Sequence, residues 1–271
     1  PVRLKEHLDA LAQKQPGARE ALLKTLLDQH GTGRVVFRNT RASMSGFPGR
    51  KFVPAALSAG SNLALLARIS RELRAEEAGA ADALRYSFRA DPRIDWLVDF
   101  LKHQRSGKIL LICKSQRKAA AIDAALQEKM AVKSALFHEG YPLVQRDRNA
   151  AWFAEPDGAQ LLICSEIGSE GRNFQFAHHL VLFDLPLNPG LIEQRIGRLD
   201  RIGQTQTIRI HVPYIRGSSD EAVVAWYHRG LDAFETPLPG GNEYQDEFRV
   251  RLLDLATAFS DGSEVWRGEL E

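Results

Sequence analysis

Short apolar runs alternate with longer amphipathic stretches between about residue 92 and residue 234. Five runs are apolar almost throughout and have the length of strands: 108–113, 132–137, 161–164, 179–183 and 207–213. The other stretches repeat apolar residues every three or four positions, as helices do: 92–101, 116–129, 144–153, a segment from 189, and 218–234. Apolar strands separated by helices predict an α/β fold, with a parallel sheet covered by helices on both faces.

Two of the predicted helices begin with the same signal. Asp91-Pro92 and Asn188-Pro189 each combine a side chain that can cap free helix amides with a proline suited to the first helical position. Both signals come directly before an apolar repeat, so we expect helices to start at Pro92 and Pro189.

Polar residues follow three of the predicted strands at the point where each strand ends. Lys114-Ser115, His138-Glu139-Gly140 and the stretch 165–173 would lie at the carboxyl edge of a parallel sheet, where such folds bind ligands. In the third segment, Gly168 and Gly171 would let backbone amides face a ligand or a neighbouring domain. Two glycines at this spacing are weak evidence alone, because glycine is common in loops.

The first 90 residues differ from this pattern. Helices are predicted at 4–13, 18–30 and 61–86. The stretch 34–51 contains five cations, with Phe37 and Phe47 among them. This composition fits a phosphate-facing patch as well as it fits a solvated connector.

These differences divide the chain into three parts. We predict a helical and basic connector at 1–90, an α/β lobe at 91–235, and a hinge with a terminal helix at 236–271.

Composition and charge narrow the class of protein. The 271 residues are 44% hydrophobic and 26% charged, and the formal net charge is +2, as in a globular protein whose nucleic-acid contacts would be local. No apolar run reaches the roughly 18 residues of a membrane span, and the first residues lack the apolar core of a signal peptide. We expect a cytoplasmic protein with no membrane partner. The absence of an initiator methionine indicates a fragment of a longer polypeptide.

Cys113 and Cys164 each end an apolar run, which predicts buried free thiols in a reducing compartment. Their spacing fits neither a disulfide nor a metal site, and His178-His179 has no partner at ligand spacing. We therefore predict that this chain holds no metal.

The stretch 194–204, Gln-Arg-Ile-Gly-Arg-Leu-Asp-Arg-Ile-Gly-Gln, carries the strongest chemical signal. On a helix, Gln194, Arg198 and Arg201 would fall within about 60° of one another, on a face separate from the apolar positions. Guanidinium groups fit phosphate oxygens better than ammonium groups do. Gly197 would weaken such a helix and allow close approach, which favours a ligand-binding face over a solvated one.

The chain lacks the usual means of holding a nucleotide. The pattern Gly-x-x-x-x-Gly-Lys-Ser/Thr is absent, and Asp220-Glu221 does not follow an apolar strand as a magnesium-binding acidic pair would. Arginines without a phosphate cradle are typical of arginine fingers, which act on a nucleotide held by another domain. We expect this chain alone to bind ATP poorly and not to hydrolyse it.

Several of these segments together resemble the Swi/Snf-type helicase-related ATPases. The stretch 165–173, then Asp184 with Asn188-Pro189, then 194–204 resemble motifs V and VI of that family, and 108–115 resembles motif IV. Other runs resemble a bacterial branch of the family whose members associate with RNA polymerase. These runs are 34–41 with Gly46-Phe47-Pro48, 137–140, 164–176 and 226–235.

The resemblance covers roughly residues 20–235. It implies the second RecA-like lobe of an ATP-dependent translocase on double-stranded DNA, which associates with RNA polymerase and promotes its release and recycling. Such a protein would lie in the bacterial cytoplasm, near the nucleoid. ATP and Mg²⁺ would be held mainly by the first ATPase lobe of the same polypeptide, which this chain lacks.

The resemblance also implies roles for individual residues. Arg198 and Arg201 would be catalytic and contact the ATP phosphates, with Gln194 supporting them. The loop that would couple nucleotide state to lobe closure contains Gly168, Ser169, Glu170, Gly171 and Asn173. The residues expected near nucleic acid are Lys114, Ser115, His138 and Ser165, with Arg38 and Arg41 of the basic stretch.

The sequence departs from the family pattern at a few positions. Asp200 stands where many relatives have His, Ser169-Glu170 where many have Gly-Leu, and Leu187 where many have Trp. The last two departures agree with the RNA-polymerase-associated branch and argue against nucleosome remodelling.

Two other functions remain open from the sequence. The chain could be a non-catalytic module that binds DNA or RNA polymerase, with its arginines in surface ion pairs. It could also be a lobe of a strand-separating helicase, although Ile202-Gly203-Gln204 disfavours that class. A small-molecule enzyme is least expected, because no complete nucleophile, acid–base or metal constellation is present.

Overall fold

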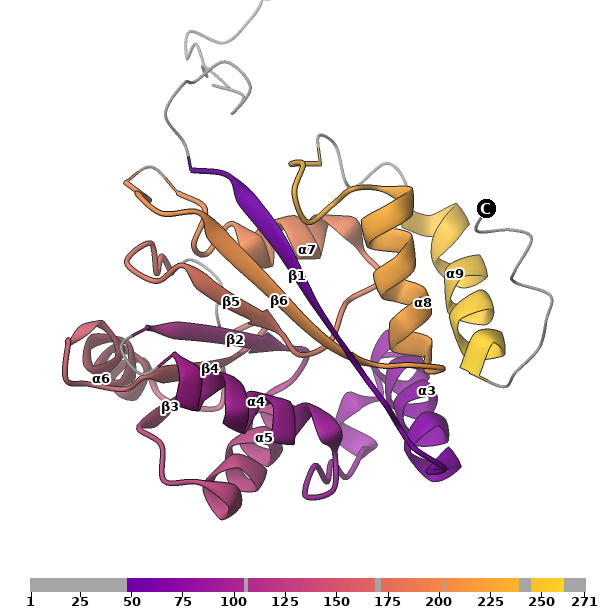
Figure 1. The fold of residues 1–271 in the computed structure, drawn as a ribbon, viewed down its shortest axis with the longest axis horizontal. Helices are drawn as coiled ribbons and strands as arrows, with labels where there is room; N and C mark the ends of the chain where they lie inside the picture. Colours follow the sequence, from indigo (N-terminus) through magenta and orange to yellow (C-terminus); the bar gives the residue numbers. More distant parts are fainter. Residues whose placement is uncertain (1–47, 105–106, 169–171, 202, 239–244, 261–271) are drawn as a thin grey trace, which may run out of the picture. The chain divides into compact units, whose positions relative to one another are not determined.

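The described part of the chain contains one sheet of six parallel strands (Figure 1). It comprises residues 48–104, 107–168, 172–201, 203–238 and 245–260 of a computed structural model. The strands are β1 (Arg50–Leu57), β2 (Ile109–Cys113), β3 (Ser134–Phe137), β4 (Leu161–Ser165), β5 (His179–Leu182) and β6 (Ile208–Ile215). Their order across the sheet is β1-β6-β5-β2-β4-β3. The predicted parallel sheet is confirmed.

Helices cover both faces of this sheet. They are α3 (Leu63–Glu77), α4 (Pro92–His103), α5 (Gln116–Lys129), α6 (Leu143–Ala154), α7 (Pro189–Ile196), α8 (Ser219–Ala225) and α9 (Gln245–Ser260). Two short turns complete the described elements: the 3₁₀ turn η2 (Ala81–Ala83) and the π-helical turn η3 (Trp226–Gly230).

Alternate strand residues enter two separate apolar layers. In β2, Ile109 and Leu111 belong to the layer formed with α4 and α5, and Leu110 and Ile112 belong to the layer formed with α6, α7, α8 and α9. Because successive side chains of a strand point to opposite faces, a strand buried on both sides must be apolar at every position. This is why the central strands appear in the sequence as continuous apolar runs.

The predicted helix starts are confirmed. The side chain of Asp91 accepts a hydrogen bond from the amide of Arg93 at 3.0 Å, and α4 begins with Pro92. The side chain of Asn188 likewise accepts from the amide of Gly190 at 2.8 Å, and α7 begins with Pro189.

The edge strand β1 was not predicted, because it lies in the segment interpreted as a connector. It pairs with β6 along its whole length, from Arg50 opposite Ile208 onwards. Its sequence lacks clear alternation and contains Pro54, which an edge strand tolerates because one side of its backbone needs no strand partner. The amide of Phe52 donates instead to the carboxylate of Glu235 at 3.0 Å. The sheet therefore includes residues before the boundary predicted at 90.

Two predicted helices are shorter than expected. The arginine helix ends at Ile196 with Gly197 as its C-terminal cap, so the prediction that it continues through Arg201 is wrong. The amides of Arg198 and Leu199 bond three residues back, at 3.2 and 3.1 Å, which is a tight turn and not an α-helix. The helix predicted at 218–234 is likewise interrupted, because α8 passes into the π-helical turn η3 after Ala225.

The helix α9 packs onto the lobe through buried Leu252 and Ala256, which belong to the same apolar layer as Val223 of α8. Cys113 and Cys164 are both buried free thiols, as predicted. In the part of the chain that the structure describes, no helix is both long enough and apolar enough to span a bilayer.

Candidate functional site

The carboxyl edge of the sheet brings together the polar segments predicted from the sequence. The strands β5, β2, β4 and β3 are consecutive neighbours. Because they are parallel, the residues that follow them lie side by side: Asp184 after β5, Lys114 after β2, Ser165 at the end of β4, and His138 after β3. The expected site at this edge is therefore built from four adjacent strand ends.

The side chains predicted near nucleic acid are mostly engaged in local bonds. Lys114, whose side chain is 24% exposed, pairs with Glu166 at 3.1 Å. The hydroxyl of Ser115 caps α5 by accepting from the amide of Lys118 at 3.2 Å. His138 stacks on Tyr141 with ring centroids 4.1 Å apart, and burial lowers its pKa. Contact of these side chains with DNA stays a prediction.

Ser165 and Gly168 form the first turn after β4. Ser165 is fully buried, and its hydroxyl accepts from the amide of Gly168 at 3.0 Å and donates to the carboxylate of Glu139. A Cβ atom at Gly168 would lie 2.5 Å from the Cα of His138 and 2.7 Å from the carbonyl oxygen of Phe137. Glycine is required here because this turn packs directly against the backbone that follows β3.

A network of buried charges lies behind these loops, and the sequence analysis did not predict it. Lys118 of α5 lies 2.8 Å from Asp184 and 2.6 Å from Glu76 of α3. Arg195 of α7 donates to the carboxylate of Asp184 at 3.1 Å, to its carbonyl at 2.7 Å, and to Glu166 at 2.9 Å. The ends of β4 and β5 are thereby tied to α3, α5 and α7.

The pKa values in this network follow burial and charge together. Burial alone would raise the pKa of the Asp184 carboxyl, but Lys118 and Arg195 hold it well below its usual range. Burial would lower the pKa of Lys118, yet Asp184 and the glutamates of α3 raise it well above its ordinary value. For Glu76, burial dominates and raises the pKa despite the nearby Lys118. The lysine and Asp184 are therefore firmly charged.

A second cluster of buried charges lies at the start of α4. Arg93 donates to both carboxylate oxygens of Asp91, at 3.0 and 2.8 Å, and to Asp220 of α8 at 2.9 Å. Burial would raise the pKa of Asp91, but Arg93 and then Arg68 lower it to about 2. Asp220, considered in the sequence only as a poor magnesium ligand, is here an ion-pair partner.

Arg198 and Arg201 lie in different surroundings beyond the end of α7. Arg198 is only 7% exposed, and its carbonyl accepts from the amide of Phe174 at 2.9 Å. Arg201 is exposed, and its Nε donates to the carbonyl of Gly197 at 2.9 Å. Gln194 is also exposed, as is Asn173. The two arginines therefore do not share one helical face.

The last residues of the arginine motif hold the turn in place. Gly203 has a φ of +98°, a conformation that glycine adopts readily and other residues rarely. Gln204 is buried, and its side-chain amide donates to the carbonyls of Ala177 and Leu199 at 2.9 and 3.2 Å. Its side-chain oxygen accepts from the amides of the next two residues. These two positions are structural in the chain.

Part of the predicted basic patch is not a free cationic surface. The guanidinium group of Arg50 is 3% exposed and bonds to Glu193 and Asp200, so it fits neither of the two interpretations left open for the stretch 34–51, a phosphate-facing patch or a solvated connector. Lys51 is exposed. The candidates Arg38, Arg41, Ser169, Glu170 and Gly171 lie outside the described residues.

The run 226–235, which carried part of the resemblance, has a packing role. The hydroxyl of Tyr227 donates to the carbonyl of Pro186 at 2.7 Å, just before α7. Phe234 stacks on Phe52 of β1 with ring centroids 4.4 Å apart. Together with the bond from Phe52 to Glu235, this segment joins β1 to the loop that starts α7.

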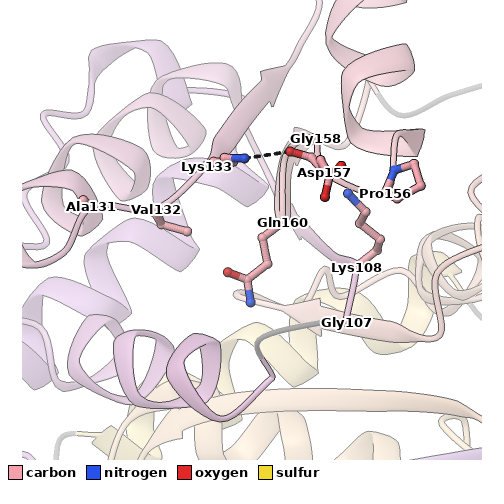
Figure 2. Close-up of a pocket in the computed structure, with 9 residues that line it drawn as sticks. All are labelled: Gly107, Lys108, Ala131, Val132, Lys133, Pro156, Asp157, Gly158 and Gln160. Carbon is pink, nitrogen blue, oxygen red and sulfur yellow. Dashed lines mark hydrogen bonds between the residues drawn. The ribbon is translucent and has the colours of Figure 1, made fainter.

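A pocket of about 340 Å³ lies at the opposite edge of the sheet, at the amino ends of β2, β3 and β4 (Figure 2). Lys133 donates to the carbonyl of Asp157 at 2.7 Å, and Lys108 donates to the carbonyl of Ala159 at 2.9 Å. Both lysines thus fasten the loop before β4. None of the predicted site residues lines this pocket, and no metal-binding cluster occurs among the described residues.

The missed residues could have been found from their positions in the apolar pattern. Lys118 lies four residues before Ile122 on the buried stripe of α5, and Arg195 lies between Ile192 and Ile196 on that of α7. A charged residue on a buried stripe requires a charged partner. The partners are far apart in the sequence, so only the fold identifies them.

Two family models match the chain. The model described as helicase conserved C-terminal domain matches residues 92–203, and the model described as RNA polymerase recycling family C-terminal matches residues 207–266. Together they cover the strands β2 to β6 and the whole of α9.

Two solved structures show the same fold. The C-terminal part of the Fun30 ATPase domain matches with a TM-score of 0.50 and 17% identity, covering 72% of this chain and 63% of that one. The SWI2/SNF2 ATPase core of Sulfolobus solfataricus, solved in complex with dsDNA, matches with a TM-score of 0.51 and 14% identity, covering 76% and 50%. The fold and the family model define a helicase C-terminal lobe of the RecA-like type.

The particular relatives are RNA polymerase-associated proteins. RapA of Pseudomonas putida (strain GB-1) is 50% identical over 248 residues, which are 88% of this chain and 26% of that protein. RapA of a second Pseudomonas putida strain is 48% identical over 258 residues, which are 92% and 27%. The chain is a homologue of RapA and spans about a quarter of the length of these curated relatives. The resemblance stated from the sequence is confirmed.

Proposed function

We propose that this chain is the second motor lobe of an ATP-dependent translocase on double-stranded DNA that associates with RNA polymerase and promotes its release and recycling. The names of its RNA polymerase-associated relatives and of the RNA polymerase recycling family model support the polymerase partnership. The helicase family model supports the motor role, and a solved neighbour of the same fold was bound to dsDNA.

The surroundings of Arg201 carry this proposal. Its Nε is anchored on the carbonyl of Gly197, and its side chain is exposed beyond the carboxyl-terminal end of α7. Among the described residues, its two terminal nitrogens have no hydrogen-bond or ion-pair partner. A guanidinium group held at one nitrogen and open at two can donate to phosphate oxygens in a fork. Arg201 is therefore the arginine finger in this proposal.

Arg198 and Gln194 take supporting roles. Arg198 is mostly buried, so it would reach a phosphate only if the turn opened or if the partner lobe closed directly over it. Gln194 is exposed and would lie on the surface that faces the partner lobe. We call residues 197–201, which contain Arg198 and Arg201, the arginine turn. The loop that contains Gly168 and Asn173 would respond to lobe closure, because the amide of Phe174, directly after it, donates to the carbonyl of Arg198 in this turn.

The hydrogen-bond donors of this lobe suit the phosphate end of ATP. The described residues offer an exposed guanidinium group for the phosphates and no cluster that could hold Mg²⁺. Bound ATP would supply the phosphoanhydride bond whose cleavage drives the motor, and the first lobe would hold it together with the metal. This lobe would then stabilise the negative charge that develops on the transferred phosphoryl group.

DNA would run across the carboxyl edge of the sheet. Lys114 is the cation that the sequence predicts at this edge, and His138, which follows β3 on the far side of β4, is mostly buried. Phosphate contacts of this kind contribute affinity without sequence preference, which suits a translocating motor. Arg38 and Arg41 stay candidates for further contacts with nucleic acid, whereas the exposed Lys51 lies near the start of β1, at the opposite edge of the sheet.

The test is DNA-stimulated ATP hydrolysis by the complete protein, with the first lobe present. Arg201→Ala should lower kcat on the order of 10³-fold or more while ATP binding is retained, as expected for an arginine finger. Arg89→Ala is the matched control, because it removes an exposed arginine that forms an exposed ion pair with Glu128. A loss of less than about tenfold for both Arg201→Ala and Arg198→Ala would contradict the finger.

A further inference from the structure

Arg50, at the first position of β1, bridges two acidic residues that flank the arginine turn. Its Nε donates to Asp200 at 2.7 Å, and its two terminal nitrogens donate to the two carboxylate oxygens of Glu193 at 2.8 and 2.5 Å. The side chains of Arg50 and Asp200 are only 3% and 2% exposed. All three guanidinium nitrogens are therefore used within the lobe.

The two acidic residues hold opposite ends of the segment that presents Arg201. Glu193 lies in α7, before the helix ends, and Asp200 lies after the turn, directly before Arg201. The amide of Asp200 donates to the carbonyl of Ile196 at 3.1 Å, and the amide of Arg201 donates to that of Leu199 at 3.1 Å. α7 ends at Ile196, so its regular backbone ladder does not continue to Arg201. The side-chain bonds of Arg50 to Glu193 and Asp200 link the two ends of this segment instead.

Arginine is suited to this position and lysine is not. One planar guanidinium group forms a bidentate pair with Glu193 and a third bond to Asp200, so it fixes the positions of both carboxylates relative to each other. An ammonium group would neutralise the same carboxylates without fixing the angle between them. Asp200 is the second acidic partner, and it completes the bridge from Arg50 to Glu193.

We propose that Arg50 is a positioning residue for Arg201 and acts through Asp200 and Glu193. This inference rests on the proposed function of Arg201 as an arginine finger. Its consequence is that β1, which precedes the residues matched by the helicase family model, is part of the ATPase machinery. The strand aims the arginine turn while it also closes the edge of the sheet.

The test compares two buried aspartates in the complete protein. Asp200→Ala removes one partner of Arg50 and leaves it paired with Glu193. Asp220→Ala removes one partner of Arg93 and leaves it paired with Asp91, so it is a control of matched chemistry. The readouts are kcat and KM for DNA-stimulated ATP hydrolysis, together with the midpoint of thermal unfolding for each variant.

Asp200→Ala should lower kcat about 10- to 100-fold, the cost of a finger displaced by about 1 Å, with KM for ATP little changed. Asp220→Ala should leave kcat within about twofold, even if its unfolding midpoint falls as much. The double variant Asp200→Ala with Arg201→Ala should match Arg201→Ala alone, because no finger is left for Asp200 to position. Arg50→Lys, which keeps the charge and loses the fork, should lower kcat in the same direction as Asp200→Ala.

Two results would overturn the inference. One is a kcat for Asp200→Ala and Arg50→Lys within about twofold of the wild-type value. The other is a loss from Asp200→Ala that multiplies the loss from Arg201→Ala, since that would show an effect independent of the finger. Failure of the proposed function gives a different outcome, namely a small loss for Arg201→Ala itself.

Discussion

The ammonium nitrogen of Lys118 lies 2.8 Å from a carboxylate oxygen of Asp184, and the two side chains are 4% and 10% exposed. The same nitrogen lies 2.6 Å from Glu76, so one cation joins α3 to the end of β5. Asp184 in turn accepts from Arg195 of α7. A continuous series of buried charges therefore connects α7 to α5 and α3.

Removing the central cation of this series should destabilise the protein strongly. In Lys118→Met, the buried carboxylates of Asp184 and Glu76 lose their shared partner, which typically costs about 3–5 kcal/mol of unfolding free energy. Lys102→Met is the control, because Lys102 forms only an exposed pair with Asp99 at 3.6 Å. Its cost should stay below about 1 kcal/mol. Urea unfolding measures both, and equal costs for the two variants would contradict a structural role for the network.

The buried pair His179 and His211 should make stability fall in mild acid. Nδ1 of His179 and Nε2 of His211 lie 3.0 Å apart, and burial and then neighbouring positive groups lower their pKa values to about 4 and about 3. In the unfolded chain, histidine has a pKa near 6.5, so the unfolded state binds more protons and is favoured as the pH drops below about 6.5.

His211→Gln tests this pH dependence because it keeps a hydrogen-bonding side chain and removes one titrating group. Between pH 6.5 and pH 5, the unfolding free energy of the variant should fall less steeply, by up to about 1.4 kcal/mol per pH unit. Urea unfolding at several pH values gives both slopes. Identical slopes for the variant and the wild type would show that His211 is not held neutral in the folded state.

Gly168 should not tolerate even a methyl group. An alanine Cβ would meet the Cα of His138 at 2.5 Å and the carbonyl oxygen of Phe137 at 2.7 Å, and a backbone cannot move as a flexible side chain can. We expect Gly168→Ala to cost about 1–3 kcal/mol of unfolding free energy, as overpacking does. Gly49→Ala is the control, because its Cβ would meet nothing within 4 Å. Similar unfolding midpoints for both variants would contradict the close packing.

Much of the fold follows from the sequence because local signals are consistent. The helix at 116–129 was predicted to the residue, and capping by Asp91 and Asn188 fixed two further helix starts. The strand β1 was not predicted, because an edge strand is less buried and its apolar pattern is weak. An edge strand also tolerates a proline such as Pro54. The end of α7 at Ile196 was not predicted, because the apolar repeat of this helix continues past Gly197 to Leu199.

The sequence predicted where the candidate site lies, at the carboxyl edge of the sheet, but not the contacts between its residues. Parallel strands bring their carboxyl ends to one edge, so Lys114, His138 and Ser165 could be grouped from the strand pattern alone. Their partners could not be identified, because Asp184, Glu166 and Arg195 meet through the fold and not through spacing in the sequence. For the same reason the ion pairs of Arg50 could not be predicted, since 143 residues separate it from its partner Glu193.

The central claim is that Arg201 reaches the phosphate of ATP held by another lobe. It is tested most directly by a structure of the complete protein with ADP and a metal fluoride that mimics the transferred phosphoryl group. The account predicts that a terminal nitrogen of Arg201 lies at about 3 Å from a fluoride, with Nε still bonded to Gly197 and Arg50 still paired with Asp200. A closed complex in which Arg201 points into solvent, or pairs with a carboxylate of its own lobe, would contradict it.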